Sequence, residues 1–461
     1  MKKIYLDYAA TSPVKPAVLK AMTPYFCDVF GNPSSIHSFG RKARQKVEES
    51  RKTIAKFINC DPEEIIFTSG GTESDNLAIR GLINALYPEI LFAFSHPIQP
   101  TPHSGDRHFA NNISLIKNKT NSYLPHIITS AFEHHAVLDT CRDLEKRSLA
   151  EVTYVKPDEQ GIIHVEDIKK AVKSNTVLVS IMYVNNEIGT VQPIAEIAKM
   201  IKKLKAMPTG RRAKSKKLYL HTDAVQAVEY QEMDVKKLGV DMLSISAHKF
   251  GGPKGVGALY LKKGTPMHRE NIGGAQEFKL RAGTENVAGI VGMAKAIDLL
   301  TLLEKDVHSL HGAQASGKRL RPTFSSKVID VSDNKNNNSL TKLRNYFIDR
   351  ILTEISDTRL NGSKKQRNPN NVNVSFKYIE GEAILLHLDM AGIAASSGSA
   401  CTSGSLDPSH VLLAIGMRHE DAHGSIRFTL GEQTTKKEID YVMDNLKRII
   451  PMLREMSPFG K

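Results

Sequence analysis

The sequence predicts an α/β fold, with a mostly parallel central sheet in a large domain and a smaller α+β domain. Between about residues 40 and 265, short apolar runs alternate with segments of helical periodicity. Strands separated by helices form βαβ units, in which the strands pair in parallel. In the last third of the chain, apolar residues recur at every second position in 372–376 and 426–430. That period is typical of half-buried strands.

The individual elements follow from their apolar patterns and end signals. Runs rich in β-branched residues predict strands at 65–69, 126–129, 152–155 and 176–181. Stripes of helical period predict helices at 43–58, 74–86, 137–149 and 291–310. Thr435 and Glu438 have the spacing of a capping box, and the apolar stripe behind them predicts a last helix that continues to Leu453.

These patterns divide the chain into two domains. We expect the large domain to cover residues 17–290, and the small domain to combine 1–16 with 291–461. The helix at 291–310 is expected to connect them. Polar segments without a sustained period predict surface loops, which are 88–125, 207–217 and 332–339.

The composition is that of an ordinary globular protein. Among 461 residues, 41% are hydrophobic and 24% are charged, and no apolar run reaches membrane-spanning length. Sequence that is typical of a folded domain begins within the first few residues, so no signal peptide is expected. The only cysteines are Cys27, Cys60, Cys141 and Cys401, which show no close pairing. We therefore expect a cytoplasmic protein with reduced thiols and no membrane contact.

The net charge is +14, from 63 Lys and Arg against 49 Asp and Glu. A basic surface attracts nucleic acid or acidic proteins, but it also serves general solubility. The second explanation is the simpler one, so we do not expect direct nucleic-acid binding.

Two strand-like runs carry the most informative residues. His221–Gln226 brings Asp223 to the end of one strand, and Ser244–Lys249 brings Lys249 to the end of another. The carboxyl ends of parallel strands form the ligand-binding edge of an open α/β sheet. A lysine for a Schiff base and a carboxylate opposite a pyridine nitrogen are what pyridoxal 5'-phosphate (PLP) requires.

Other motifs could contribute to the same ligand site, although each also has a purely structural explanation. Gly70 and Gly71 join a strand to a helix, which suits a phosphate but also an ordinary turn. His134 follows a strand and is either a ring-stacking, proton-moving imidazole or a capping or core residue. The evidence for a zinc site at His134 is weaker, because no paired His or Cys motif accompanies this residue. Asn186 is either a ligand-binding amide or part of a turn.

Cys401 lies in the run Ser396–Ser405, which consists of small residues around a single thiol. Cys141 instead lies in an apolar helical stripe, as expected of a structural cysteine. A thiol in a flexible loop is accessible and can ionise, which makes Cys401 a candidate nucleophile.

Together these residues closely resemble the cysteine desulfurases of PLP fold type I, the class V aminotransferase-like group. The matching motifs follow the expected order and cover most of the chain outside the polar segments; they are 5–11, 30–35, 68–76, 133–140, 184–189, 223–226, 246–249, 281–284 and 425–428. The long serine- and glycine-rich run around Cys401 resembles the subgroup that supplies sulfur for iron–sulfur clusters and tRNA thiolation. Ala247 stands where the family often has glycine, and the C-terminal tail resembles the scaffold-docking tail only loosely.

The resemblance implies a role for each matching residue. The catalytic residues would be Cys401, Lys249 and His134. The residues that hold PLP would be Gly71, Thr72, His134, Asn186, Asp223, Gln226, Ser246, His248, Lys249 and, across a homodimer contact, Thr284. The substrate would be bound by Asn32, Asn186 and Arg427, whose planar guanidinium suits a carboxylate. No resident metal is implied, although Cys401 would contact a cluster transiently.

The implied reaction removes sulfur from L-cysteine, leaving L-alanine and a persulfide on Cys401. A mobile cysteine loop in the small domain would deliver the sulfur to an acceptor, such as a cluster scaffold or a tRNA-thiolation protein. A selenocysteine lyase or another fold type I PLP enzyme is the alternative. A non-enzymatic basic binding protein is a third reading, supported only by the charge.

Overall fold

The structure is a computed structural model that describes residues 3–88, 124–206, 217–312, 335–398 and 408–457. Its centre is a seven-stranded sheet with the order β2-β8-β7-β6-β5-β3-β4. The pairs from β7 to β4 are parallel, whereas β8 runs antiparallel to both β7 and β2. The predicted mostly parallel sheet is therefore confirmed. The strands are β2 Ile65–Thr68, β3 His126–Ser130, β4 Glu151–Val155, β5 Thr176–Ser180, β6 Tyr219–Asp223, β7 Met242–Ser246 and β8 Gly257–Leu261.

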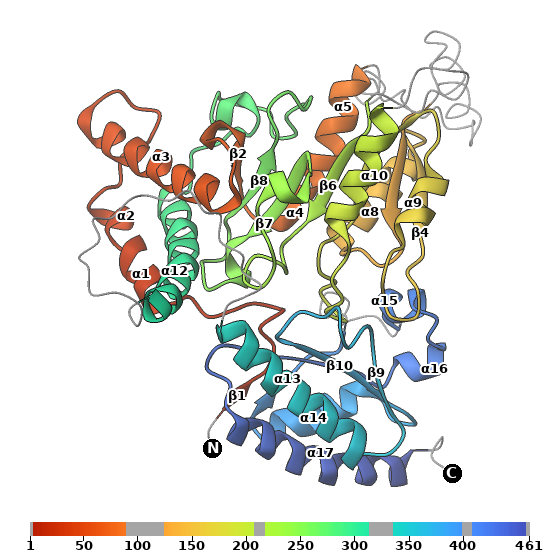
Figure 1. Ribbon diagram of the computed structural model, residues 1–461. Helices are drawn as coiled ribbons and strands as arrows, with labels where there is room; N and C mark the ends of the chain where they lie inside the picture. The colour runs from red at the N-terminus through yellow and green to blue at the C-terminus, as the bar shows by residue number, and fades with distance from the viewer. Residues whose placement is uncertain (1–2, 89–123, 207–216, 313–334, 399–407, 458–461) are drawn as a thin grey trace, which may run out of the picture.

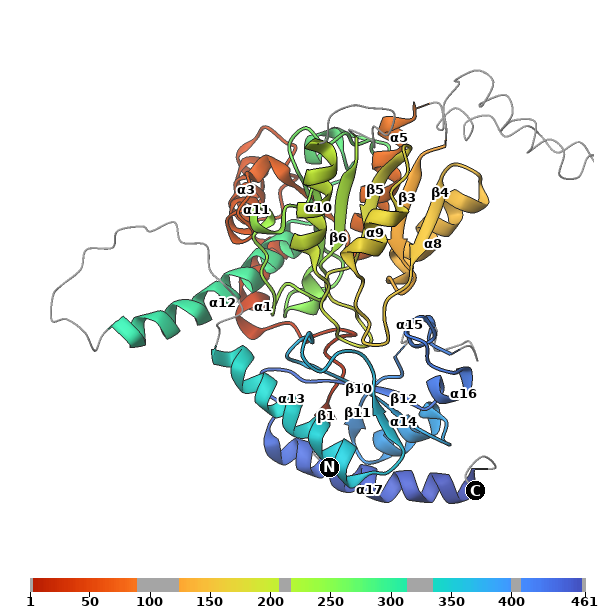
Figure 2. The ribbon, with the colours of Figure 1, turned by 45° about the vertical axis from the view of Figure 1, so that its right-hand side comes forward.

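Helices cover both faces of this sheet (Figures 1 and 2). Successive residues of one strand enter opposite cores: Leu243 and Ile245 of β7 pack on one face, and Met242 packs on the other. This alternation explains why the strands read as continuous apolar runs, since neither face meets water. The helices of this part are α1 Pro16–Met22, α2 Pro24–Cys27, α3 Ser38–Ile58, α4 Gly71–Asn76, α5 Leu82–Leu86, α8 His135–Lys146, α9 Val165–Ala171, α10 Ile194–Ala206, α11 Val235–Leu238 and α12 Val287–Gly312.

A second body with its own core lies below the large sheet in Figure 1. Its antiparallel sheet has the order β12-β10-β9, and β1 pairs with β11 beside it. The first strand and the last helix both belong to this body. The strands are β1 Ile4–Tyr5, β9 Thr358–Leu360, β10 Asn371–Phe376, β11 Ile393–Ala394 and β12 Ser425–Thr429. The helices are α13 Lys335–Glu354, α14 Gly381–Met390, α15 His410–Ala414, α16 His419–Ala422 and α17 Lys436–Met456.

Several predicted element ends are confirmed and others are corrected. The capping box of α17 is present, with the Thr435 and Glu438 side chains each accepting the other's backbone N–H. The predicted helix 74–86 is interrupted by a π-helical stretch at Leu77–Gly81. The prediction of a loop over 332–339 is wrong from Lys335 onward, because α13 begins there and buries Asn337. Residues 332–334 lie outside the described part, as do most of 88–125 and 207–217.

The packing of α12 bears on where the two domains meet. Its residues Met293 and Ile297 are buried in the core that contains α1 and α3, and Gly292 lies against Met22. We therefore propose a domain boundary later than residue 290. Among the described residues, no helix combines the length and the apolar character needed to cross a bilayer.

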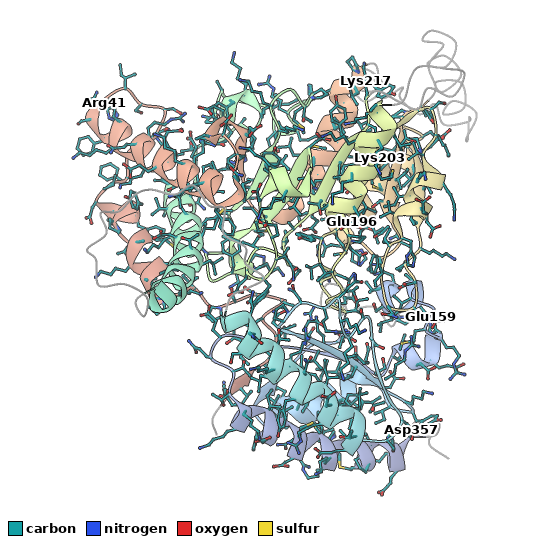
Figure 3. All side chains as sticks on the ribbon, in the orientation of Figure 1. Arg41, Glu159, Glu196, Lys203, Lys217 and Asp357 are labelled. Atoms are coloured by element: carbon teal, nitrogen blue, oxygen red, sulfur yellow. The ribbon has the colours of Figure 1, made fainter. Side chains whose placement is uncertain are left out.

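Charged side chains lie at the outside of both bodies. Figure 3 labels Arg41 of α3 at the edge of the large body, Lys203 on α10 and Asp357 in the small body, and all three are exposed. Charges of both signs are thus distributed over the surface, which fits the solubility explanation of the net charge.

Candidate active site

A cavity of about 400 Å³ lies between the large sheet and the small body. Asp223 ends β6 and Ser246 ends β7, while His134 and Asn186 follow β3 and β5, so this is the edge that the strand directions predict. Arg427 enters from β12 of the small body. The predicted site residues that line the cavity are Gly71, Thr72, His134, Asn186, Asp223, Gln226, Ser246, His248, Lys249 and Arg427.

Lys249 is held by the N-terminal segment. Its Nζ donates to the backbone oxygens of Ala9 and Ala10 at 2.6 and 2.9 Å. Gln226 Nε2 also donates to the Ala9 oxygen, at 2.9 Å. The sequence motif Tyr5–Thr11 therefore has a physical function in the site, because it places the lysine amine beside Gln226.

Asp223 is buried at the base of the cavity, where its Oδ1 accepts the Val225 N–H at 2.8 Å. Desolvation raises the pKa of Asp223 to about 6, although that hydrogen bond opposes the shift. Burial and the Asp223 charge also raise the pKa of Asp75, which lies beside it. A cationic ligand group would stabilise both carboxylates, and a protonated pyridine nitrogen is such a group.

A neutral histidine lies beside one of these carboxylates, Asp75, within the sheet. His221 contacts Ser180 Oγ at 2.8 Å and Ser244 Oγ at 3.0 Å, and it lies 3.6 Å from Asp75 Oδ1. Desolvation lowers the pKa of His221 to about 3, so the imidazole stays neutral near pH 7. His221 therefore brings no positive charge to Asp75, whose Oδ1 has no hydrogen-bond partner among the described residues, so a balancing charge would have to come from the cavity side.

The glycine turn after β2 packs closely against the turn that follows β6. A Cβ at Gly71 would lie 2.7 Å from Val225 Cγ2, so this position requires glycine. Thr72, Ser246 and His248 contribute polar groups to the same cavity. Glu73 accepts the Ser69 N–H at 2.7 Å and pairs with Arg281 at 2.8 Å, which ties the turn to the segment 281–284.

His134 caps α8, since its Nδ1 accepts the Ala136 N–H at 3.1 Å. The capping explanation is therefore correct, and it holds together with a place in the cavity wall. Desolvation lowers the pKa of His134 to about 4, so this ring is neutral near pH 7. The Glu133 carboxyl beneath it accepts from Ser130 Oγ at 2.5 Å, and burial raises its pKa to about 8.

At the other end of the cavity, Arg427 is almost fully buried and incompletely paired. Its Nη2 contacts Asp7 Oδ1 at 2.9 Å, and its Nη1 donates to the backbone oxygen of Asn186 at 2.9 Å. Among the described residues, neither Arg427 Nε nor Asn186 Oδ1 has a hydrogen-bond partner, although both atoms are buried. Buried polar atoms are normally satisfied, so a ligand carrying both acceptors and donors fits this end. A free amino acid has both.

Glu187 joins the cavity to both flanks of the segment 399–407. Ser409 Oγ donates to Glu187 Oε2 at 2.5 Å, and a Cβ at Gly398 would lie 2.5 Å from the same oxygen. Burial raises the pKa of Glu187. Cys401 itself lies outside the described residues, and its predicted role stays a prediction.

Two predicted residues are not in the cavity of this chain. Asn32 is exposed, and its side chain accepts the Ser34 N–H at 2.9 Å. Thr284 is also exposed. Conversely, sequence reasoning did not assign Asp75, Glu187, His135 or His410, although all four line the cavity. The first three stand within matched motifs, whereas His410 gives no signal beyond a Ser-His pair at a helix start.

Comparison with known proteins identifies the family. The family model described as Aminotransferase class-V matches residues 4–94, 110–342 and 329–442. The chain belongs to this family. Its members depend on PLP, and the predicted cofactor and fold type are thereby supported.

Individual relatives match over almost the whole chain. "Cysteine desulfurase IscS" of Dictyoglomus turgidum is 48% identical, over 99% of this chain and 97% of the relative. "Cysteine desulfurase IscS" of Methanosarcina thermophila is 43% identical, over 99% and 94%. Among solved structures, "NIFS-LIKE PROTEIN" aligns with a TM-score of 0.75 and 30% identity, covering 98% of this chain and all of that one. "SspA in complex with cysteine" aligns with a TM-score of 0.67 and 30% identity, covering 94% and 100%.

The residues that line the cavity fit PLP independently of the comparisons. Asp223 is a buried carboxylate that a ring cation would stabilise, Lys249 has a primary amine, and Thr72, Ser246 and His248 offer polar groups that would suit a phosphate. When bound, PLP supplies an electron sink for an amino acid joined to it.

Proposed function

We propose that the protein is a PLP-dependent cysteine desulfurase, which removes sulfur from L-cysteine, releases L-alanine and keeps the sulfur as a persulfide on Cys401. One observation carries the proposal. Lys249 and Asp223 share a cavity with a nearly buried guanidinium, Arg427, whose Nε has no partner among the described residues. The cavity thus joins a cofactor end to an end that fits an amino acid carboxylate. The relatives do not favour a selenocysteine lyase.

Each side chain of the cavity has its own role in the proposed reaction. Arg427 and Asn186 bind and orient the carboxylate of L-cysteine, and Asp223 keeps the ring nitrogen of the cofactor protonated. Gln226 would donate a hydrogen bond to the ring oxygen of the cofactor, and Thr72, Ser246 and His248 would hold its phosphate. The Lys249 amine takes the α-proton of the substrate and returns a proton later. His134, neutral at working pH, stacks on the ring and assists proton transfer.

The sulfur transfer balances without an added oxidant. The Cys401 thiolate forms a bond to the substrate sulfur while the carbon–sulfur bond breaks. The electron pair of that bond stays with the carbon, and a proton completes the methyl group of alanine. The persulfide then carries the sulfur to an acceptor protein, which is a cluster scaffold or a tRNA-thiolation protein.

We infer that the protein acts as a homodimer in the cytoplasm. Thr284 is exposed and outside its own cavity, as a residue that serves the second subunit would be. Large apolar side chains stand exposed around the segment 26–39 and at Ile272, which is 81% exposed. Patches of this kind mark protein interfaces. Asn32 stands in the same region, so its predicted contact with substrate would also depend on the second subunit.

The deciding experiment uses L-cysteine with the purified, PLP-loaded protein. Alanine release and a sulfur adduct on the Cys401 peptide are expected, the latter seen by mass spectrometry. Cys401→Ser should keep the cofactor absorbance and lose most sulfur release, while Cys27→Ser, at an exposed thiol, serves as the matched control. Lys249→Ala should lose the lysine-linked absorbance. Normal turnover by Cys401→Ser would reject the proposal for the nucleophile.

A further inference from the structure

We propose that His135, which lines the cavity, and Asp139 behind it form a second acid–base pair, in which His135 accepts the thiol proton of the substrate. This inference rests on the proposed desulfurase function and extends it to residues that sequence reasoning left without a role. Both residues belong to the first two turns of α8, and His135 directly follows the cap residue His134. His135 lines the same cavity as Lys249 and Arg427.

The geometry of the pair fixes the tautomer of His135. Its Nδ1 lies 3.1 Å from Asp139 Oδ2, one helical turn away. An ionised carboxylate only accepts hydrogen bonds, so Nδ1 carries the hydrogen and Nε2 carries the lone pair. Asp139 is held in turn by Arg142, whose Nη1 lies 3.1 Å from Oδ1. A carboxylate that orients an imidazole in this way also stabilises the imidazolium once a proton arrives.

The lone pair of His135 is buried and unused. Among the described residues, Nε2 has no hydrogen-bond partner, and this atom is shielded from solvent although the side chain as a whole is 30% exposed. An unsatisfied buried acceptor costs about 1–3 kcal/mol, and such atoms in native proteins call for an explanation. A thiol placed in the cavity would give Nε2 the donor that it lacks.

The neighbouring histidines cannot take this role as well. His134 uses its Nδ1 as the helix cap, and desolvation holds its pKa near 4, which makes it a weak base. His410 contacts the Glu133 backbone oxygen through Nε2 at 2.9 Å, so it is a donor there. The His410 ring meets the His135 ring edge-on, with centroids 4.9 Å apart, and is therefore a positioning residue for it.

The charges around His135 come from three elements. Asp139 and His134 belong to α8 and its cap, His410 to α15, and Glu187 to the loop after β5. Of these, only Asp139 is paired with His135 at hydrogen-bond distance. The proton leaves as the Cys401 thiolate attacks: the sulfur–hydrogen bond of the substrate breaks, a nitrogen–hydrogen bond forms at Nε2, and the electron pair stays on the outer sulfur of the new persulfide. His135 becomes an imidazolium paired with Asp139.

The test uses 3-mercaptopropionate, which has a carboxylate for Arg427 and a thiol but no amine to react with the cofactor. It is titrated into the PLP-loaded protein over a range of pH, with propionate as the reference. The ultraviolet difference spectrum reports thiolate directly, without turnover. We expect wild type to form bound thiolate at a lower pH than the free compound does.

The variants are His135→Asn and Asp139→Asn, with His164→Asn as the matched control. His164 also contacts an aspartate, Asp158, at 3.0 Å, but it does not line the cavity. His135→Asn should lose the thiolate band and slow alanine formation by about 100-fold. Asp139→Asn should weaken both, because its amide allows the wrong tautomer, and His164→Asn should match wild type.

Either of two results would overturn the inference. One is that wild type forms no bound thiolate below the pH at which the free compound ionises. The other is that His135→Asn keeps the thiolate band and alanine formation within threefold of wild type. Failure of the proposed function looks different, because wild type itself would then release no alanine from L-cysteine, whatever the thiol probe shows.

Discussion

The buried pair of Arg51 and Glu277 gives the sharpest stability prediction. The two side chains are 1% and 2% exposed and meet through two nitrogen–oxygen contacts of 2.8 Å each. Arg51 also donates to the Ile65 oxygen at 2.6 Å, and its guanidinium lies over the Phe67 ring. Glu277 further accepts the Phe67 N–H at 2.8 Å. Changing Glu277 to Gln keeps the shape of the residue but removes its charge.

The size of the effect follows from burial. Removing one partner of a buried ion pair costs roughly 3–5 kcal/mol, because the other charge stays in a medium that cannot solvate it. In Glu277→Gln, the amide NH₂ must face a donor of the Arg51 guanidinium in either orientation, and in one of them it also faces the Phe67 N–H. We therefore expect a loss of about 4 kcal/mol in the free energy of unfolding.

Urea unfolding followed by circular dichroism, at equal saturating PLP, measures this loss. The control is Asp349→Asn, which breaks an exposed contact with Lys364 and should cost on the order of 0.5 kcal/mol or less. Replacing both Arg51 and Glu277 with methionine should recover more than half of the loss, since no isolated charge remains. A loss below about 1 kcal/mol in Glu277→Gln would refute the reasoning.

Three further predictions concern the cavity and its surroundings. Arg427→Lys should raise KM for L-cysteine about 100-fold with unchanged cofactor absorbance, because an ammonium lacks the planar fork; a KM within threefold of wild type contradicts this. His221 has its pKa lowered by burial to about 3, so the unfolded chain binds the proton first and stability falls as pH decreases below about 6.5. His221→Asn should remove about 2 kcal/mol of the stability lost between pH 7 and pH 5, and unfolding curves that shift in parallel in both proteins argue against it. Gly398→Ala should slow alanine formation roughly tenfold, because its Cβ would meet Glu187 Oε2 at 2.5 Å; an unchanged rate disproves the contact's importance.

The parts of the site that the sequence predicted are those set by strand direction. Asp223 and Ser246 each end a strand of a parallel pair, so their meeting at one edge follows from local pattern and topology. The cofactor end of the cavity was predictable for this reason. His410 and Arg427 come from the small body, and no local pattern says that this body closes over the strand ends.

Other features depend on packing between distant segments. Glu277, Phe278 and Lys279 all have positive φ, at 44°, 57° and 68°, although none is glycine. Such strain persists only where surrounding contacts impose it, and here Arg51 holds Glu277 from α3. The helix over Asn337 was missed because an Asn-rich stretch reads as a loop, whereas burial of Asn337 and Leu340 favours a helix.

Glu187 has a consequence for how relatives of this protein vary. Ser409 donates to one Glu187 oxygen, and the Gly398 backbone lies so close to the same oxygen that a Cβ would be 2.5 Å from it, so both flanks of 399–407 meet at one carboxylate. The entropy of closing a flexible connection grows slowly with its length, by about 0.6 kcal/mol for each doubling. A change in the number of residues between these two flanks should therefore cost little stability, and relatives could differ in length here while the residues of the cavity stay the same.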